Sequence, residues 1–415
     1  KASLGLNYNG VTGYRSDDEV SNFRIRPERR NEYEMGTDLS LFNGKMGVSA
    51  TLYNAISTDI IYDIDVIPST GADEMTANGA SIQNNGLELT FDYRVLDNQD
   101  FTWETKFIYA SNNNTVLEMN GIDGEMAKTM DPNLIPSRGI AKFSEVSPGH
   151  EYAEFKVLSW ARFGHGIAVD HDLDINTPDV AIDTLSDYDW QKNDVYIAKS
   201  GLPIMYSEKI WSGYAPNPDW TGSFYNDFKI GKKIKVSCLL DISMGGHIAN
   251  YTKNSLYEWG THADTDKRYH PDFDNPDWFG YEEGVSTEWG KGRFQELINH
   301  GHRAIGPGQD TIINFSQNLY ENYMGRNTDV INNIEDASYM KLREIAISYN
   351  FGPANMVFLG EPNVTVRLSA QDIKTWTNYS GWDPETNMYQ DRISGEDYFN
   401  QPQTWRANLS LQLNW

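Results

Sequence analysis

Apolar and polar residues alternate one by one in many segments of this chain. The pattern is clearest in the last segment, where one face carries Trp405, Ala407, Leu409, Leu411, Leu413 and Trp415. A period of two indicates a β-strand, because successive side chains point to opposite sides of a sheet. About 12 segments show it and are predicted to be strands. They lie near residues 1–9, 31–42, 45–62, 80–95, 101–115, 138–146, 152–163, 221–230, 233–250, 338–351, 363–376 and 403–415.

One of these segments changes its phase. Between Met340 and Phe351 the alternation shifts by one position near Arg343 and Glu344. A single extra residue in one strand has this effect, so the sequence predicts a β-bulge there.

The connections between the predicted strands alternate in length. Short connections lie at Asn43-Gly44, 96–100, 147–151, Gly231-Lys232 and 352–362. Long connections lie at 10–30, 63–79, 116–137, 164–220, 251–337 and 377–402. A membrane β-barrel sorts its loops in this way, because its short turns face the periplasm and its long loops face outside. A soluble propeller or sandwich, which remains the alternative, has no reason to do so.

The composition favours the barrel. Hydrophobic residues make up only 39% of the 415 residues while aromatic residues reach 13%, and the mean hydropathy is −0.59. A barrel wall needs apolar residues only at every second position, with aromatic residues at the two membrane interfaces. No run approaches the 18 apolar residues of a transmembrane helix. We therefore predict an all-β fold, a transmembrane antiparallel β-barrel.

Charge and cysteine content exclude several functions. The formal net charge is −25, which disfavours nucleic acid as a partner because phosphate contacts need clustered basic residues. Cys238 is the single cysteine, so an internal disulfide and a cysteine-based zinc site are excluded. No catalytic motif is present, and we predict that the chain is not an enzyme.

Five segments carry a resemblance to a known family. They read QNNGLEL at 83–89, PNPDWTG at 216–222, DASYMKLREIAISY at 336–349, VRLSAQDI at 366–373 and YSGWDPE at 379–385. In this order they resemble the late barrel of SusC-like TonB-dependent outer-membrane transporters. The chain departs from the family in having Asp-Ile where the family usually has Asn-Leu, at residues 372–373.

The resemblance implies that residues 1–415 are the C-terminal part of a plugged, 22-stranded barrel. The remaining barrel and the plug would then lie in a preceding segment or in a separate chain. The resemblance also implies insertion in outer-membrane lipid, a SusD-like lipoprotein partner, and TonB acting through the missing N-terminal region. The long loops near 164–220, 251–337 and 377–402 would be extracellular and the C-terminus periplasmic. Glycans are the more common substrates of the family and peptides the alternative, and no cofactor is required.

One acidic loop raises the possibility of a calcium site. Asp170, Asp172 and Asp174 have the spacing of the first oxygen ligands in a calcium loop. The position of the turn glycine is occupied by Ile175, and Ala181 stands where a glutamate would close the site. Calcium is therefore a possible ligand, and a solvated acidic loop is the alternative.

Aromatic and acidic residues in the long loops are the candidates for ligand binding. They are Trp259, Trp278, Tyr281 and Trp289, with Asp383 and Glu385 in the next loop. Aromatic rings beside carboxylates suit sugars, whose C–H faces stack on rings while their hydroxyls form hydrogen bonds. The same residues also suit a protein interface or the internal packing of a lid.

We predict outer-membrane import of a nutrient oligomer. A barrel scaffold within a surface assembly is the first alternative. A soluble, β-rich carbohydrate-binding protein is the second.

Overall fold

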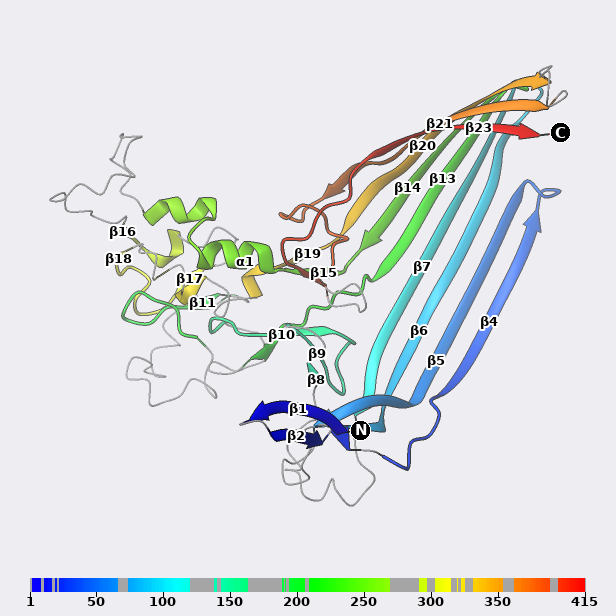
Figure 1. The fold of residues 1–415 in the computed structure, drawn as a ribbon. Helices are drawn as coiled ribbons and strands as arrows, with labels where there is room; N and C mark the ends of the chain where they lie inside the picture. Colours follow the sequence, from blue (N-terminus) through cyan, green and yellow to red (C-terminus); the bar gives the residue numbers. More distant parts are fainter. Residues whose placement is uncertain are drawn as a thin grey trace.

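A large antiparallel sheet dominates the molecule (Figure 1). The computed structural model describes residues 2–8, 11–16, 19–20, 22–65, 74–119, 138–139, 143–162, 189, 191, 194–205, 209–268, 291–296, 303–314, 319, 322–324, 331–353, 362–388 and 395–414. Within them, no helix is both long enough and apolar enough to cross a membrane.

The sheet has the strand order β23-β21-β20-β14-β13-β7-β6-β5-β4. Its strands are β4 (Arg29–Leu41), β5 (Met46–Asp65), β6 (Glu74–Asp97), β7 (Phe101–Met119), β13 (Trp220–Ile230), β14 (Ile234–Met244), β20 (Tyr339–Pro353), β21 (Asn363–Thr377) and β23 (Arg406–Asn414). Each strand on this path pairs antiparallel with its neighbour, and the short β3 (Glu19–Val20) pairs parallel with β6. The order is a meander, the arrangement expected for a barrel wall.

Three of the predicted strands do not belong to this sheet. The segments 138–146 and 152–163 hold β8 (Arg138–Gly139), β9 (Ser144–Val146) and β10 (Glu154–Val157), which form a separate small sheet with β12 (Ile210–Trp211). The segment 1–9 holds β1 (Ala2–Tyr8), which pairs with β2 (Val11–Ser16). In β9, Ser144 and Val146 are buried and Glu145 is less so, and such alternation alone cannot distinguish a strand of a folded loop from a wall strand.

The two faces of the sheet differ in chemistry. Ile347, Leu368 and Leu409 pair across three neighbouring strands on one face, and Leu409 is 75% exposed. In water each such side chain would forgo about 2 kcal/mol of burial free energy. The next row, on the opposite face, is polar and contains Arg367 and Ser410. An apolar outer face and a polar inner face are what a membrane barrel requires, so the predicted fold class is confirmed.

Loop lengths are sorted between the two ends of the sheet. The short connections at 42–45, 98–100, 231–233 and 354–362 lie at one end, and the connections at 66–73, 120–219, 245–338 and 378–405 lie at the other. The connection at 66–73 is an exception to the sorting: it was predicted to be long, over 63–79, but β5 and β6 extend into it and leave it shorter than 354–362. The rest of the predicted parity survives the loss of the two strands at 138–146 and 152–163, because removing a consecutive pair leaves the alternation unchanged. At the predicted Asn43-Gly44 turn, both residues have positive φ, 58° and 79°.

The predicted bulge is also confirmed. The pairing of β20 with β14 and with β21 shifts between Leu342 and Glu344, and Arg343 is the residue passed over. Two adjacent side chains, Arg343 and Glu344, consequently reach polar partners on the inner face.

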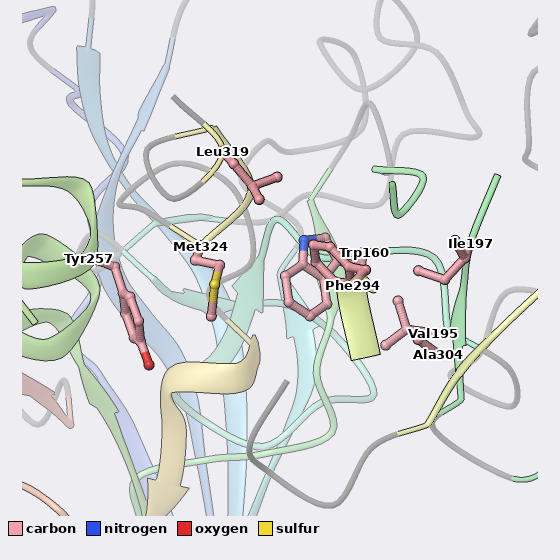
Figure 2. Close-up of a cluster of buried hydrophobic side chains, with 8 residues drawn as sticks. All are labelled: Trp160, Val195, Ile197, Tyr257, Phe294, Ala304, Leu319 and Met324. Carbon is pink, nitrogen blue, oxygen red and sulfur yellow. The ribbon is translucent and has the colours of Figure 1, made fainter. Parts of the chain in front are cut away.

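The two longest connections fold together and have a core of their own. β11 (Val195–Tyr196) from the first connection pairs parallel with β17 (Ala304–Ile305) from the second. Figure 2 shows the cluster that holds them: Trp160, Val195, Ile197, Tyr257, Phe294, Ala304, Leu319 and Met324. We call this loop domain the cap. Its other elements are β15 (His247–Asn250), α1 (Tyr251–Glu258), η4 (Ala263–Arg268), β16 (Lys291–Gly292), η5 (Phe294–Glu296), β18 (Ile313–Asn314), η6 (Ile331–Asn333) and β19 (Ile334–Asp336).

The last long connection joins the cap as well. Its short strand β22 (Glu396–Asp397) pairs parallel with β15, which also pairs with β19. Residues 378–405 therefore bridge the cap and the wall strands β21 and β23.

Candidate functional site

The predicted site residues are only partly brought together. Trp259 lies at the end of α1 in the cap, whereas Asp383 and Glu385 lie in the connection that follows β21. The other predicted residues, Trp278, Tyr281 and Trp289, and the candidate calcium ligands Asp170, Asp172 and Asp174, fall outside the described residues. Within the described part of the chain, no group of three or more histidine, cysteine or acidic side chains is arranged to hold a metal ion. The calcium site stays a prediction.

Helix α1 places Trp259 at the surface of the cap. The Asn250 side chain caps the helix by accepting a hydrogen bond from the Lys253 N–H at 2.9 Å. The helix ends where Gly260 takes a positive φ of 66°. Tyr257 is thereby turned into the cap core, while Trp259 remains 51% exposed.

Trp259 does not stand alone on this surface. Its ring stacks on that of Phe399, with centroids 5.5 Å apart and planes 10° from parallel, although Phe399 is itself 48% exposed. Phe399 has a φ of 51°, which costs a non-glycine residue about 1 kcal/mol or more. The Phe399 N–H donates to Thr252 Oγ1 at 2.6 Å and so helps to hold this conformation. Exposed, strained aromatic residues of this kind are typical of binding surfaces.

A series of ring contacts fixes this stacked pair to the interior. Phe399 packs edge-on against Tyr398 at 5.1 Å, and Tyr398 stacks on Tyr251 at 4.6 Å. Tyr251 in turn packs edge-on against the buried Phe143 at 5.2 Å. These contacts tie the exposed pair to the interior, and side chains held in this way lose less conformational entropy on binding. Phe399 was not predicted from the sequence, because its partner lies in a different connection.

Glu385 is held against the wall by three side chains of β20. It accepts hydrogen bonds from Tyr339 Oη at 2.7 Å and from Arg343 Nη1 at 3.0 Å, and it also pairs with Lys341. Burial by itself would raise the pKa of Glu385, but the hydrogen bonds from Arg343, Lys341 and Tyr339 outweigh burial and lower the pKa to about 2.

Arg343, the bulge residue, is the centre of this cluster. Its Nε lies 2.6 Å from Asp241 Oδ2 on β14, and its Nη1 lies 3.3 Å from Asp372 Oδ1 on β21. Asp372 has a φ of 51° and also pairs with Arg406 of β23 at 3.1 Å. The bulge thus directs one guanidinium toward carboxylates on both neighbouring strands and on the connection above them.

Asp383 has an internal role too. It is buried, and its Oδ2 accepts from the Gln403 N–H at 3.2 Å. Its Oδ1 accepts from the Glu385 N–H at 3.1 Å and lies 3.5 Å from Lys341 Nζ. Both predicted ligand carboxylates therefore anchor residues 378–405 to the wall.

The anchored segment is the YSGWDPE motif, and its other residues have related roles. The buried Tyr379 donates to Asp397 Oδ2 at 2.7 Å, and its ring passes over Gly381, where an added Cβ would lie 2.4 Å from ring atom Cε1. Burial and the Asp397 carboxylate raise the pKa of Tyr379. Trp382, held between these anchors, is 80% exposed. The motif thus fixes the segment and presents one tryptophan.

A second ion pair joins helix α1 to the same segment. Glu335 on β19 pairs with Lys253 Nζ at 3.0 Å and accepts from the Ser380 N–H at 2.8 Å. Burial opposes ionisation of Glu335, but Lys253 and the Ser380 hydrogen bonds prevail and lower its pKa. Helix α1, which ends at Trp259, is thereby tied to the segment that carries Trp382.

Comparison with known proteins agrees with this architecture. No protein-family model matches the chain. TonB-dependent receptor P3 of Formosa agariphila is 23% identical over 410 residues, which cover 95% of this chain and 35% of that protein. Receptor P39 of the same organism is 24% identical over 398 residues, covering 92% of this chain and 35% of that protein. The TonB-dependent receptor SusC of Bacteroides thetaiotaomicron is 23% identical over 103 residues, 25% of this chain and 10% of that protein.

Solved structures give the same result for the fold. The RagAB peptide importer in its closed-closed state superposes with a TM-score of 0.60 at 13% identity, covering 100% of this chain and 38% of that chain. The chain thus spans little more than a third of the relatives it matches. The named relatives are receptors and an importer, not enzymes. The resemblance to SusC-like TonB-dependent receptors that the five sequence segments indicated is confirmed.

Proposed function

Taking the chain as a portion of a SusC-like TonB-dependent receptor, we propose that it forms part of the barrel of an outer-membrane importer of a nutrient oligomer. The cargo we propose is a glycan rather than a peptide. The observation that carries the proposal is the sheet itself, with its apolar outer face, its polar inner face and its long loops gathered at one end.

The orientation follows from the loops. The cap and residues 378–405 would face the cell exterior, and the short turns and the C-terminus would face the periplasm. Such barrels have short periplasmic turns and longer extracellular loops, and recognition is commonly carried by loops. The exposed Trp259, Phe399 and Trp382 would then lie on the side from which a nutrient arrives.

Two partners belong to this proposal. A SusD-like lipoprotein would cover the extracellular mouth, and TonB would act through the part of the receptor that this chain does not include. The rigid aromatic residues of the cap support a surface at which sugars or a partner protein are bound, because Trp and Phe supply large contact areas at small entropic cost. Calcium bound by Asp170, Asp172 and Asp174 remains an additional proposal.

Affinity purification from outer membranes tests the proposal. The receptor, tagged and expressed in its own bacterium, should require detergent for extraction and should retain a SusD-like lipoprotein. Cells lacking the receptor gene should fail to take up a glycan that wild-type cells import, and dissipation of the proton gradient should have the same effect. Recovery of the receptor in the soluble fraction, or unchanged glycan uptake in the deletion strain, would contradict it.

A further inference from the structure

The inner face of the sheet contains a pocket that none of the described cap residues lines. It lies over β4, β5, β6 and β7 and has a volume of about 510 Å³. This volume is within the range of small-molecule sites. Every side chain that lines the pocket is polar, and they come from positions that the strand pairing places on the inner face. The ring of Tyr53 is the main apolar surface among these lining side chains.

A tyrosine forms the floor of the pocket. Tyr53 on β5 pairs with Gly86 on β6, and Gly86 pairs with Asn112 on β7. Tyr53 Oη reaches across the middle strand and donates to Asn112 Oδ1 at 3.1 Å. An added Cβ at Gly86 would lie 2.1 Å from the Ser111 carbonyl oxygen of β7 and 2.5 Å from Tyr53 Oη, so the close approach of β7 and the crossing of Tyr53 both require glycine there. The end of the ring therefore lies beside Gly86 of β6, and Tyr53 lines the pocket.

Amide groups continue this floor. Asn112 Nδ2 donates to Asn84 Oδ1 at 3.1 Å, so Tyr53, Asn112 and Asn84 form one hydrogen-bonded series. The tyrosine and both amides are thereby oriented by one another. The glycine of the QNNGLEL segment, which only marked a family resemblance in the sequence, is what allows this arrangement.

The walls offer both donors and acceptors. Arg30 pairs with Glu32, with 3.0 Å between Nε and Oε2. Glu34 and Glu88 also line the pocket, and neither has a hydrogen-bond or ion-pair partner among the residues that the structure describes. An oriented ring face, amides, a guanidinium and free carboxylates therefore surround one volume.

We propose that this pocket is a subsite for a sugar ring of the imported oligomer, an inference that rests on the proposed function. The C–H face of a pyranose would lie on Tyr53, and its hydroxyls would donate to Glu34 and Glu88. Hydroxyls both donate and accept, which matches the mixed lining, and hydrogen bonds to carboxylates are the stronger kind. A basic peptide side chain could pair with Glu34 and Glu88, so binding of basic peptides is the competing outcome of the test.

The test uses the full-length receptor purified in detergent with its co-purifying partner and applied to an array of neutral and acidic oligosaccharides. The saccharide that binds the wild type is then titrated by calorimetry against Tyr53→Ala, Glu88→Gln and Ser49→Ala. Ser49 lies on the same face of β5 outside the pocket and serves as the control. We expect a loss of affinity of about tenfold or more for the first two variants and no change for the third.

The outcomes separate this subsite from the proposed function. If both Tyr53→Ala and Glu88→Gln bind the saccharide with wild-type affinity, the subsite proposal is overturned, while the proposed import function is unaffected. The proposed subsite is also overturned if the receptor binds peptides but no oligosaccharide on the array. Glu88→Gln decides the matter if Tyr53→Ala fails to reach the outer membrane. If cells lacking the whole receptor lose uptake but cells with Tyr53→Ala or Glu88→Gln do not, the result supports the import function and contradicts the subsite.

Discussion

Arg343 forms a bidentate ion pair with Glu385, which joins the bulge of β20 to the connection that carries the YSGWDPE motif. Its Nη1 lies 3.0 Å from Glu385 Oε2, and its Nη2 pairs with Oε1. Paired guanidinium–carboxylate contacts of this geometry are directional as well as strong. The segment that presents Trp382 is thereby held in one position relative to the barrel interior.

Replacing Glu385 by glutamine should release this segment. The change leaves Arg343 and the buried Lys341 without their main carboxylate, and breaking a buried pair costs about 3 kcal/mol. Hydrogen exchange of residues 379–388 should accelerate in the purified receptor while the wall strands keep their protection. Glu118→Gln, at an exposed position on β7, is the matched control and should change nothing. Equal protection of the segment in Glu385→Gln and wild type would show that the ion pair is dispensable.

Acid should weaken the same contact. The pKa of Glu385 in the folded protein is about 2, below the ordinary value of 4.5, so its contribution is complete above pH 4.5 and is lost as the pH falls toward 2. Exchange of residues 383–388 should therefore increase across that range in the wild type. In Glu385→Gln this component of the pH dependence should be absent. An identical profile in the two proteins would assign the effect to other groups.

The stacked pair on the cap should contribute to binding more than to stability. Trp259→Ala removes a ring that is about half exposed, so the free energy of unfolding should fall by about 1 kcal/mol or less. Tyr251→Ala, within the same series of rings but buried, should cost about 3 kcal/mol. Thermal unfolding measures the stability loss of both variants. Calorimetry should then show that Trp259→Ala binds the saccharide or lipoprotein more weakly than the wild type does. Unchanged affinity would show that Trp259 does not contribute to binding.

Gly381→Ala should disturb the motif from within. The new Cβ would lie 2.4 Å from the Tyr379 ring, which would have to move away from Asp397. We expect a loss of about 2 kcal/mol, measured by thermal unfolding. Tyr379→Phe, which removes only the hydrogen bond, should cost less, about 1 kcal/mol. A Gly381→Ala protein as stable as the wild type would mean that the ring has room to shift.

The two faces of β23 should respond differently to a charge. Leu409→Arg places a guanidinium on the outer face, where an arginine in lipid costs about 2–4 kcal/mol depending on depth. Ser410→Arg places the same group on the polar inner face. The amount of folded receptor in the outer membrane should fall for Leu409→Arg and remain close to wild type for Ser410→Arg. Equal amounts would contradict a lipid-facing outer surface.

The sequence by itself determined the wall. A strand that faces lipid on one side and a polar interior on the other must alternate, so the faces of β23, the bulge at Arg343 and the sorting of loop lengths are all visible in the order of residues. These features are local, since each depends on neighbours along the chain. The same locality explains the error at 138–146 and 152–163, where buried alternation in a folded loop imitates a wall strand.

Only the tertiary structure decided how distant residues meet. Asp383 and Glu385 remain predicted ligand residues, and only the structure shows that Lys341 and Arg343 pair with them. Phe399 gained a role only when Trp259, from another connection, stacked on it. Gly86 stood out as part of a motif, yet the atoms that leave no room for a side chain there, Tyr53 Oη and the Ser111 carbonyl oxygen, belong to the two neighbouring strands. Loops and cross-strand side chains are placed by packing between segments far apart in the chain, and local periodicity carries no information about such contacts.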